Sequence, residues 1–246
     1  MDKQLRLSLS YIKKNFFRIN WLKTIWFNMS VLPFKDAIRI PLLLSYNVEI
    51  KRIGTIKLES RPLPGMIKIG LPRINTDMIK EPILISNNGT IIFRGLAKIH
   101  MGAKLNIRSG EVILGDRTTI GNCTKIVCMK KIQTGENTRI SWNCQLFDTD
   151  FHFLYNTESK TYYTRVKPII IGNNVFIGNG CTIAKGTNIP DGCVISCCTK
   201  ISGDFSKLGN NLLIKGNTGK VVKTGVQMTS GWFPELEKQI EDLVNE

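Results

Sequence analysis

The chain has 246 residues, of which 42% are hydrophobic, and it carries a net charge of +15 at pH 7. This length predicts one large domain or a domain with appendages, and the hydrophobic content allows a sizeable core. No uncharged apolar run reaches the length of about eighteen residues that a transmembrane helix needs, and we expect no secretory signal at the start of the chain.

The seven cysteines all lie between residues 123 and 198 and form no C-x-x-C pair. An odd number without that spacing argues against a disulfide framework or a zinc knuckle, so we expect a cytoplasmic, reducing compartment. The positive charge favours anionic partners such as nucleic acid, membrane surfaces or phosphorylated ligands. No nucleic-acid-binding module is recognisable, and we expect no such partner.

The first part of the chain, residues 1–82, is predicted to be a leader that caps the next domain. Residues 1–30 are basic and aromatic, with apolar side chains near helical spacing. Such a helix either packs on the rest of the protein, which we expect, or makes a peripheral contact with an anionic membrane. Six of the nine prolines lie in residues 31–82 and exclude long helices from most of that stretch.

Residues 83–223 contain a six-residue rhythm that fits neither a helix nor an amphipathic strand. Isoleucine recurs at Ile171, Ile177, Ile183, Ile189, Ile195 and Ile201. Three hexads would make one triangular coil whose aliphatic residues point inward and stack at the strand spacing of about 4.8 Å. A second inward position near each corner takes small side chains, and Cys144, Cys181 and Cys193 occupy it as compact hydrophobic residues.

The rhythm stops between residues 153 and 168, where we predict an extruded loop. Long loops in compact domains are often functional. Residues 224–246 form a tail in which Pro234 and the apolar spacing after it predict a short helix.

Two histidines occur, and only one has the surroundings of a catalytic residue. His100 alternates with apolar residues, so we expect it to face outward on a coil in a structural role. His152 follows Asp150 and Asp148 at positions i−2 and i−4. In an extended chain these side chains share one side, so an acid can accept from one ring nitrogen and leave the other as a base. The alternative is a solvent-exposed polar turn.

These segments resemble the hexapeptide-repeat O-acetyltransferases, which include galactoside, maltose, capsule and lipopolysaccharide acetyltransferases. The resemblance rests on Phe147–His152 (FDTDFH), on Lys167–Gly178 (KPIIIGNNVFIG) after the loop, and on Ile214–Val222 (IKGNTGKVV). It covers roughly residues 83–223. It implies an all-β fold, a left-handed parallel β-helix, which is an exception to the right-handed crossover rule.

The same resemblance implies a homotrimer with active sites between subunits and acetyl-CoA as the acyl donor. His152 would then be the general base, oriented by Asp150 or Asp148. Cofactor contacts would come from the following residues by motif position: Phe176, Gly178, Ser196, Cys197 and Lys220. The chain departs from the family pattern at Phe176, which replaces tryptophan, at Ser196–Thr199 (SCCT), at Gly203 and at Thr218–Gly219.

We therefore predict an acetyl-CoA-dependent O-acetyltransferase that acts on a hydroxyl of a sugar or surface-polysaccharide precursor. An N-acetyltransferase acting on an amino sugar and a catalytically inactive scaffold remain as alternatives. A prism-shaped carbonic anhydrase would need three histidines for zinc, whereas this chain has two, so we expect no metal. A nucleotidyltransferase is unsupported because no glycine-rich nucleotide domain precedes the repeat.

Overall fold

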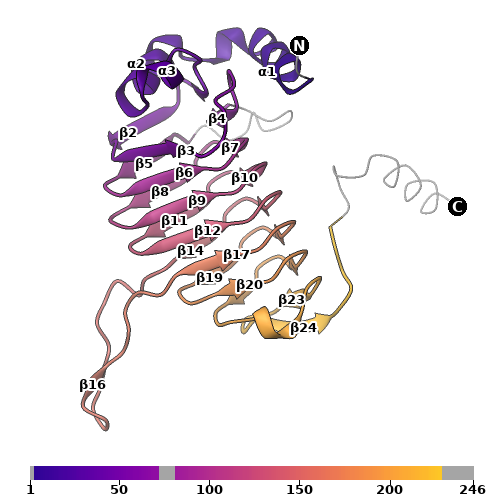
Figure 1. The fold of residues 1–246 in the computed structure, drawn as a ribbon. Helices are drawn as coiled ribbons and strands as arrows, with labels where there is room; N and C mark the ends of the chain where they lie inside the picture. Colours follow the sequence, from indigo (N-terminus) through magenta and orange to yellow (C-terminus); the bar gives the residue numbers. More distant parts are fainter. Residues whose placement is uncertain (1–2, 72–80, 229–246) are drawn as a thin grey trace, which may run out of the picture.

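The computed structural model describes residues 3–71 and 81–228, and most of them form a solenoid of triangular coils (Figure 1). Three parallel sheets, of nine, seven and six strands, make its faces. In the first sheet, parallel pairing joins β1 (Leu42–Leu44), β4 (Ile67–Ile69), β7 (Ala97–Ile99), β10 (Thr118–Ile120), β13 (Arg139–Ile140), β18 (Phe176–Ile177), β21 (Val194–Ile195) and β23 (Leu213–Lys215).

The other two sheets follow the same coils. The second sheet contains β2 (Val48–Arg52), β5 (Ile83–Asn87), β8 (Lys104–Ile107), β11 (Lys125–Cys128), β14 (Gln145–Phe147), β19 (Thr182–Ala184) and β22 (Lys200–Ile201). The third contains β3 (Thr55–Leu58), β6 (Thr90–Phe93), β9 (Glu111–Leu114), β12 (Lys131–Thr134), β17 (Ile169–Ile171) and β20 (Asn188–Ile189). This architecture confirms the predicted left-handed parallel β-helix.

The core is a set of aliphatic columns that run along the solenoid axis. In the first sheet Ile120 pairs with Ile99 and Ile140, and Ile177 pairs with Ile140 and Ile195. All of these side chains are buried, as are the six isoleucines of the predicted rhythm. Apolar burial of this kind contributes roughly 25 cal/mol for each Å² removed from water, so the columns are the main source of stability.

Small residues fill the predicted second interior position. Cys144, Cys181 and Cys193 are fully buried, and the Cys144 thiol donates to the carbonyl of Gly178 at 3.1 Å. Residues at the corners adopt a left-handed backbone conformation with positive φ, and both asparagine and glycine occupy these positions. Asn143 and Gly180 adopt φ of 56° and 69° at successive turns of one corner, and Asn137 and Asn174 do the same at another.

The coil length changes along the chain. A step from Thr182 to Lys200 is the 18 residues of three hexads, whereas the step from Lys104 to Lys125 takes 21. The earlier coils are longer because they carry wider turns between the second and third sheets, such as the turn between Ile107 and Glu111.

The solenoid starts before the boundary that the sequence predicted. We expected residues 1–82 to be a leader, but β1, β2 and β3 already pair in parallel with β4, β5 and β6. The first coil thus begins at Leu42. The sequence hid this coil because a proline-containing turn separates β3 from β4, and residues 72–80, which lie outside the described part, separate β4 from β5.

Helices close the end of this first coil. They are α1 (Lys3–Lys14), the 3-10 helix η1 (Phe16–Arg18), α2 (Trp21–Val31) and α3 (Phe34–Ala37). The side-chain amide of Asn28 donates to the carbonyl of Leu42 at 2.8 Å and accepts from its N–H at 3.1 Å, and Thr24 accepts from the N–H of Leu44 at 3.1 Å. The helical layer therefore satisfies the exposed edge of β1. Within the part of the chain that the structure describes, no helix is long and apolar enough to cross a membrane.

The opposite end closes differently. Strand β24 (Lys220–Lys223) folds back antiparallel on β23 and becomes the last strand of the first sheet. A second 3-10 helix, η2 (Ser206–Leu208), lies in the connection between β22 and β23. The predicted helix within residues 224–246 falls on the segment from residue 229 onward, outside the described residues.

Candidate active site

An antiparallel hairpin replaces the turn between β14 and β17 and extends away from the solenoid (Figure 1). Its arms are held by the bridge between Thr149 and Val166 and by the hydrogen bond from the Asp150 N–H to the carbonyl of Arg165 at 3.1 Å. Strands β15 (Tyr155–Asn156) and β16 (Thr161–Tyr162) pair further out. The predicted loop at residues 153–168 is thus the outer part of a hairpin whose base holds Asp148, Asp150 and His152.

Asp148 anchors the base of this hairpin to the solenoid. Its carboxylate is fully buried and accepts from the backbone N–H groups of Met129, Lys130 and Lys131 at 2.8, 2.6 and 2.8 Å. These three donors replace the water that a buried carboxylate loses. The expected hydrogen bond between Asp148 and His152 is therefore absent, because the Asp148 side chain points into the corner of the coil above.

Asp150 lies on the outside of the same segment. Its carboxylate forms an ion pair with Lys185, whose ammonium also donates to the carbonyl of Thr164 at 2.6 Å. Lys185 comes from the turn after β19, one coil further along, so this contact ties the hairpin to the next coil. Asp150 is thus placed near the hairpin base, but its recorded partner is Lys185 and not His152.

His152 is exposed and makes no hydrogen bond with any described residue. Its neighbours hold the backbone in place: the Phe151 ring packs edge-on against Phe147 at 5.7 Å, and the Arg165 guanidinium lies 4.4 Å from the Phe153 ring. Phe151 has φ of 66°, and its N–H donates to the hydroxyl of Thr149 at 3.1 Å. The chain therefore turns between Asp148 and His152, and the extended geometry expected there does not form.

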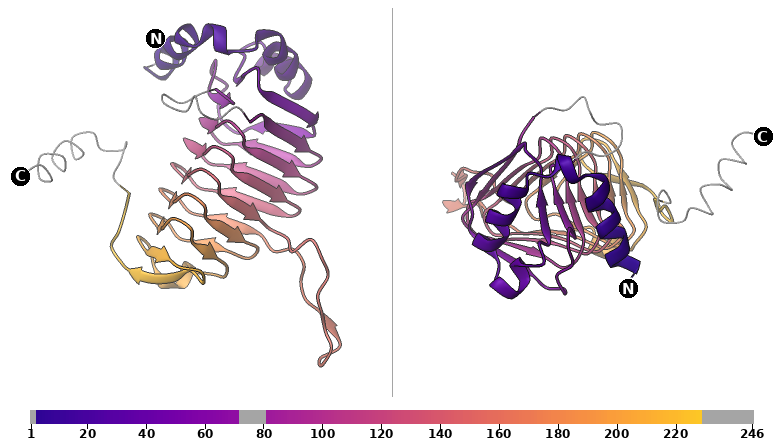
Figure 2. Two further views of the ribbon diagram at one scale, coloured as in Figure 1. Left: turned by 180° about the vertical axis from the view of Figure 1, so that it is seen from behind. Right: turned by 90° about the horizontal axis from the view of Figure 1, so that it is seen from above.

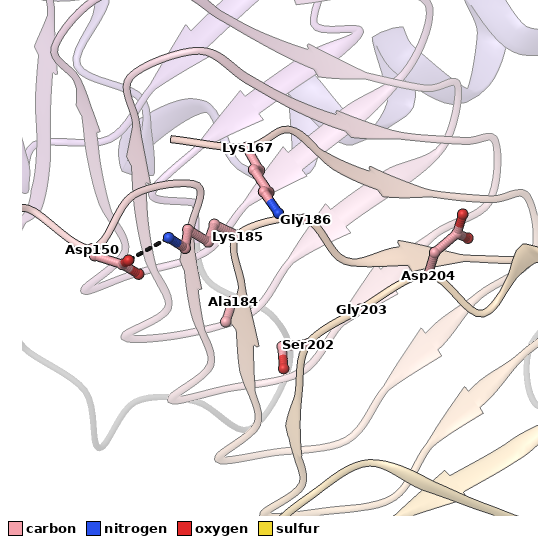
Figure 3. A pocket seen from close by; sticks show the side chains of 8 residues that line it. All are labelled: Asp150, Lys167, Ala184, Lys185, Gly186, Ser202, Gly203 and Asp204. Atoms are coloured by element: carbon pink, nitrogen blue, oxygen red, sulfur yellow. Dashed lines mark ion pairs between the residues drawn. The ribbon is translucent and has the colours of Figure 1, made fainter. Parts of the chain in front are cut away.

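A groove lies beside the hairpin base, where the turns that follow β19 and β22 stack (Figure 3). Its volume is about 550 Å³, and it is lined by Asp150, Lys167, Ala184, Lys185, Gly186, Ser202, Gly203 and Asp204. Lys167 makes no ion pair with the described residues. Hydrogen bonds from Ser206 lower the pKa of Asp204, so this carboxylate stays ionised near neutral pH. The groove presents charges of both signs to a polar ligand.

The five residues predicted to contact the cofactor lie elsewhere on the solenoid. Phe176 and Gly178 belong to one coil, and Ser196 and Cys197 belong to the next, directly beneath them. A Cβ on Gly178 would lie 2.7 Å from the backbone nitrogen of Cys197, so only glycine permits this stacking. Lys220 is exposed on β24. These residues sit around the turn between the first and second sheets, whereas His152 sits at the turn between the second and third.

Two further expectations meet different outcomes. His100, which we expected to face outward in a structural role, is only 9% exposed and lies in the turn after β7. Cysteine chemistry is disfavoured at Cys128, since burial and then the negative charge of Asp148 raise its pKa well above the usual value. The described residues contain no cluster of side chains suited to a metal ion.

Sequence reasoning missed Lys185, Lys167 and the buried role of Asp148. The lysines lie 15 and 33 residues after His152 in the chain, and only the fold brings both of them beside Asp150. The sequence could have indicated that Lys167 and Lys185 lie together, because they are 18 residues apart and one coil is 18 residues long.

Within the described residues, the stacked triangular coils and the hairpin that carries His152 give the fold expected of hexapeptide-repeat proteins. No protein-family model matches the chain. The chain is 29% identical over 196 residues to an uncharacterised 24.8 kDa protein from the cps region of Klebsiella pneumoniae, covering 80% of this chain and 85% of that protein. It is 27% identical over 114 residues to the polysialic acid O-acetyltransferase of Neisseria meningitidis, covering 46% of this chain and 53% of that enzyme.

Among solved structures, the polysialic-acid-specific acetyltransferase NeuO superposes with a TM-score of 0.46 at 20% identity, covering 81% of this chain and 83% of that one. The sequence relatives confirm the predicted resemblance to the hexapeptide-repeat O-acetyltransferases, and with it the prediction that the chain is an enzyme of this kind.

Proposed function

We propose that the protein transfers the acetyl group of acetyl-CoA to a hydroxyl of a sugar in a surface polysaccharide or its precursor, with His152 as the general base. The exposed imidazole at the base of the hairpin carries the proposal, because its ring is open to a ligand and lies on a segment fixed on both sides by aromatic contacts. The similarity to a polysialic acid O-acetyltransferase supports a polysaccharide acceptor.

Acetyl-CoA would supply the acetyl group as an activated thioester. The residues around Gly178 and Cys197 fit an uncharged, extended arm, because glycine and small side chains keep that turn open. The final coil fits the phosphates, since Lys200, Lys207, Lys215, Lys220 and Lys223 are all exposed there. Ammonium groups recognise phosphate as point charges.

His152 would accept the proton of the acceptor hydroxyl while its oxygen attacks the acetyl carbon. An alcohol is a weak nucleophile near neutral pH, so it needs a base at this moment. The proton then passes from the imidazolium to the leaving sulfur, and no covalent enzyme intermediate is required. Asp150, two residues before His152 in the chain, would be the acid that orients the ring, and its ion pair with Lys185 holds it at the hairpin base.

The site would be completed by a second chain in a homotrimer. In one chain, the second sheet lies between the turn that bears His152 and the turn that bears Ser196 and Cys197. If the prisms pack side by side, the histidine corner of one subunit faces the cofactor corner of its neighbour. Closed cyclic assembly is the usual arrangement for soluble homo-oligomers.

The groove beside Asp150 is our candidate for contacts with the acceptor. Lys167 and Lys185 offer cations for the carboxylates or phosphates of an acidic glycan, and Ser202 offers a hydroxyl for its polar groups (Figure 3). The hairpin that starts beside the groove adds Tyr155 and Tyr162, which are exposed and whose tilted rings have centroids 5.0 Å apart. Aromatic faces of this kind suit sugar rings.

The decisive experiment measures release of CoA thiol from acetyl-CoA in the presence of acidic and neutral glycans. The wild-type protein should release thiol with at least one acceptor, and His152→Ala should lower the rate by about a hundredfold or more. Acetyl-CoA binding, followed by calorimetry, should be the same in both proteins. Near-normal turnover in His152→Ala would remove the histidine from the mechanism.

Two alternatives make different predictions in the same assay. A catalytically inactive scaffold is favoured by the absence of an acid hydrogen-bonded to His152 among the described residues, and it predicts no heat with millimolar acetyl-CoA. An N-acetyltransferase predicts thiol release with amino sugars and none with glycans that offer only hydroxyls.

A further inference from the structure

Helix α2 buries one apolar side chain, Phe27, together with two polar side chains, and it exposes a second stripe that is apolar. Thr24 and Asn28 point inward, fully buried, because they hydrogen-bond the backbone of β1. The opposite stripe at positions i, i+3, i+4 and i+7 consists of Leu22, Ile25, Trp26 and Met29, all exposed. A helix that only packs on its own domain shows the reverse distribution.

The neighbouring segments extend this apolar surface. Phe17 of η1 is 90% exposed, Leu22 is 86% exposed and Phe34 of α3 is 73% exposed. Seen along the solenoid axis, α1, α2 and α3 lie across the end of the molecule (Figure 2). We call the exposed set Phe17, Leu22, Ile25, Trp26, Met29 and Phe34 the apolar end surface. An exposed patch of large side chains marks an interaction site.

Cations accompany the apolar end surface. Exposed positive side chains occur at Arg6, Lys13, Lys14, Arg18, Lys35 and Arg39. Among residues 5–39 the one acid is Asp36, which is half-buried. A second copy placed end to end would bring two such cationic sets together, which is unfavourable. The partner should therefore offer apolar material together with negative charge.

We propose that the apolar end surface docks on the surface of an anionic lipid bilayer. Phe17, Leu22 and Trp26 would enter the boundary between headgroups and acyl chains, while the exposed lysines and arginines of the same helical segment meet the headgroups. Tryptophan favours this depth because its ring is apolar and its N–H is polar. The solenoid axis would then rise from the membrane, with the hairpin at a distance from it. This inference does not depend on the proposed reaction.

Vesicle flotation with the full chain tests the proposal. Phosphatidylcholine vesicles with and without phosphatidylglycerol would be compared for the wild type and for the double variant Leu22→Ser, Trp26→Ser. We expect the wild type to float with the anionic vesicles, and the double variant to bind them at least about tenfold more weakly, since two large apolar groups are lost. Trp142→Ser removes a tryptophan of similar exposure from the side of the solenoid, and it should float like the wild type.

The charge requirement is tested separately with Lys13→Glu, Lys14→Glu, which leaves the apolar side chains intact. This variant should lose most binding to anionic vesicles, and raised salt should weaken binding of the wild type. Sedimentation of all variants shows whether a second copy covers the surface instead. The proposal is overturned if the wild type ignores anionic vesicles, if both variants float normally, or if Leu22→Ser, Trp26→Ser changes the oligomeric state.

Discussion

Asp148 and Asp150 are two residues apart, yet the structure assigns them separate tasks. The Asp148 carboxylate replaces the missing backbone partners of three N–H groups, whereas Asp150 stays at the surface in an ion pair. A buried acceptor of this kind cannot be exchanged without leaving donors unsatisfied. Asp148 therefore holds the hairpin base in place, whereas Asp150 remains available to the site.

Asp148→Asn should lower the free energy of unfolding by roughly 2–3 kcal/mol, because its amide nitrogen opposes a backbone donor. Asp150→Asn should change stability by less than about 1 kcal/mol, since its ion pair is partly exposed. Urea unfolding measures both, and acetyl transfer by Asp150→Asn measures its catalytic contribution. Equal stability losses in the two variants would contradict this assignment.

Lys68 of β4 gives a pH-dependent prediction. Burial, aided by the nearby Lys98, lowers its pKa to about 8 from 10.5, although the ammonium lies 4.2 Å from the Tyr11 ring. Between pH 8 and 10.5 Lys68 binds more protons in the unfolded chain than in the folded protein. The free energy of unfolding therefore rises with pH across this range. Lys68→Met should therefore stabilise the protein by roughly 1 kcal/mol at pH 7, and this gain should vanish near pH 10.5.

Thermal unfolding at several pH values checks the Lys68 prediction. Lys57→Met is the matched control, because Lys57 lies on the exposed side of β3. A Lys68→Met gain that is independent of pH would show that packing, and not the charge, is responsible.

At the scale of elements, the sequence predicted the later coils better than the earlier ones. The isoleucines from Ile171 to Ile201 repeat at the coil geometry itself, so their inward direction followed from spacing alone. The coil from Leu42 to Leu58 was hidden because its turns vary in length. The Asp148–His152 geometry failed for another reason: the expected alternation assumes an extended chain, whereas Phe151 adopts a left-handed conformation.

The hairpin is a separable element, because its outer part packs mainly on itself. The Tyr162 ring contacts the rings of Phe153 and Tyr155, and the Tyr163 N–H donates to the carbonyl of Leu154. Replacing residues 154–163 with a short glycine-containing turn should leave the melting temperature within a few degrees of the wild type. Acetyl-CoA binding should persist, while KM for the acceptor should rise at least about tenfold.

Circular dichroism, calorimetry and acceptor kinetics together test the hairpin prediction. Loss of acetyl-CoA binding in the shortened protein would assign the hairpin to the donor site instead.

At the scale of the whole molecule, a site shared between subunits can be tested by complementation. His152→Ala removes the base, and Cys197→Trp should block the proposed donor turn with a bulky side chain at an exposed position. Each variant should be inactive alone. Equal co-expression should restore about a quarter of wild-type activity, because random assembly pairs an intact histidine corner with an intact donor corner at that frequency. A site within one chain predicts no recovery.

The stacking of the coils also fixes the distance between the helical end of the solenoid and the hairpin. Along the third sheet, four steps separate β3, beside the helical end, from β17, where the hairpin returns. At the strand spacing of about 4.8 Å this is roughly 19 Å. Evolution can therefore change the reach between the two ends only in increments of one coil, because a partial coil would break every column of the core. The number of coils thus sets the distance between His152 and any surface that the helical end contacts.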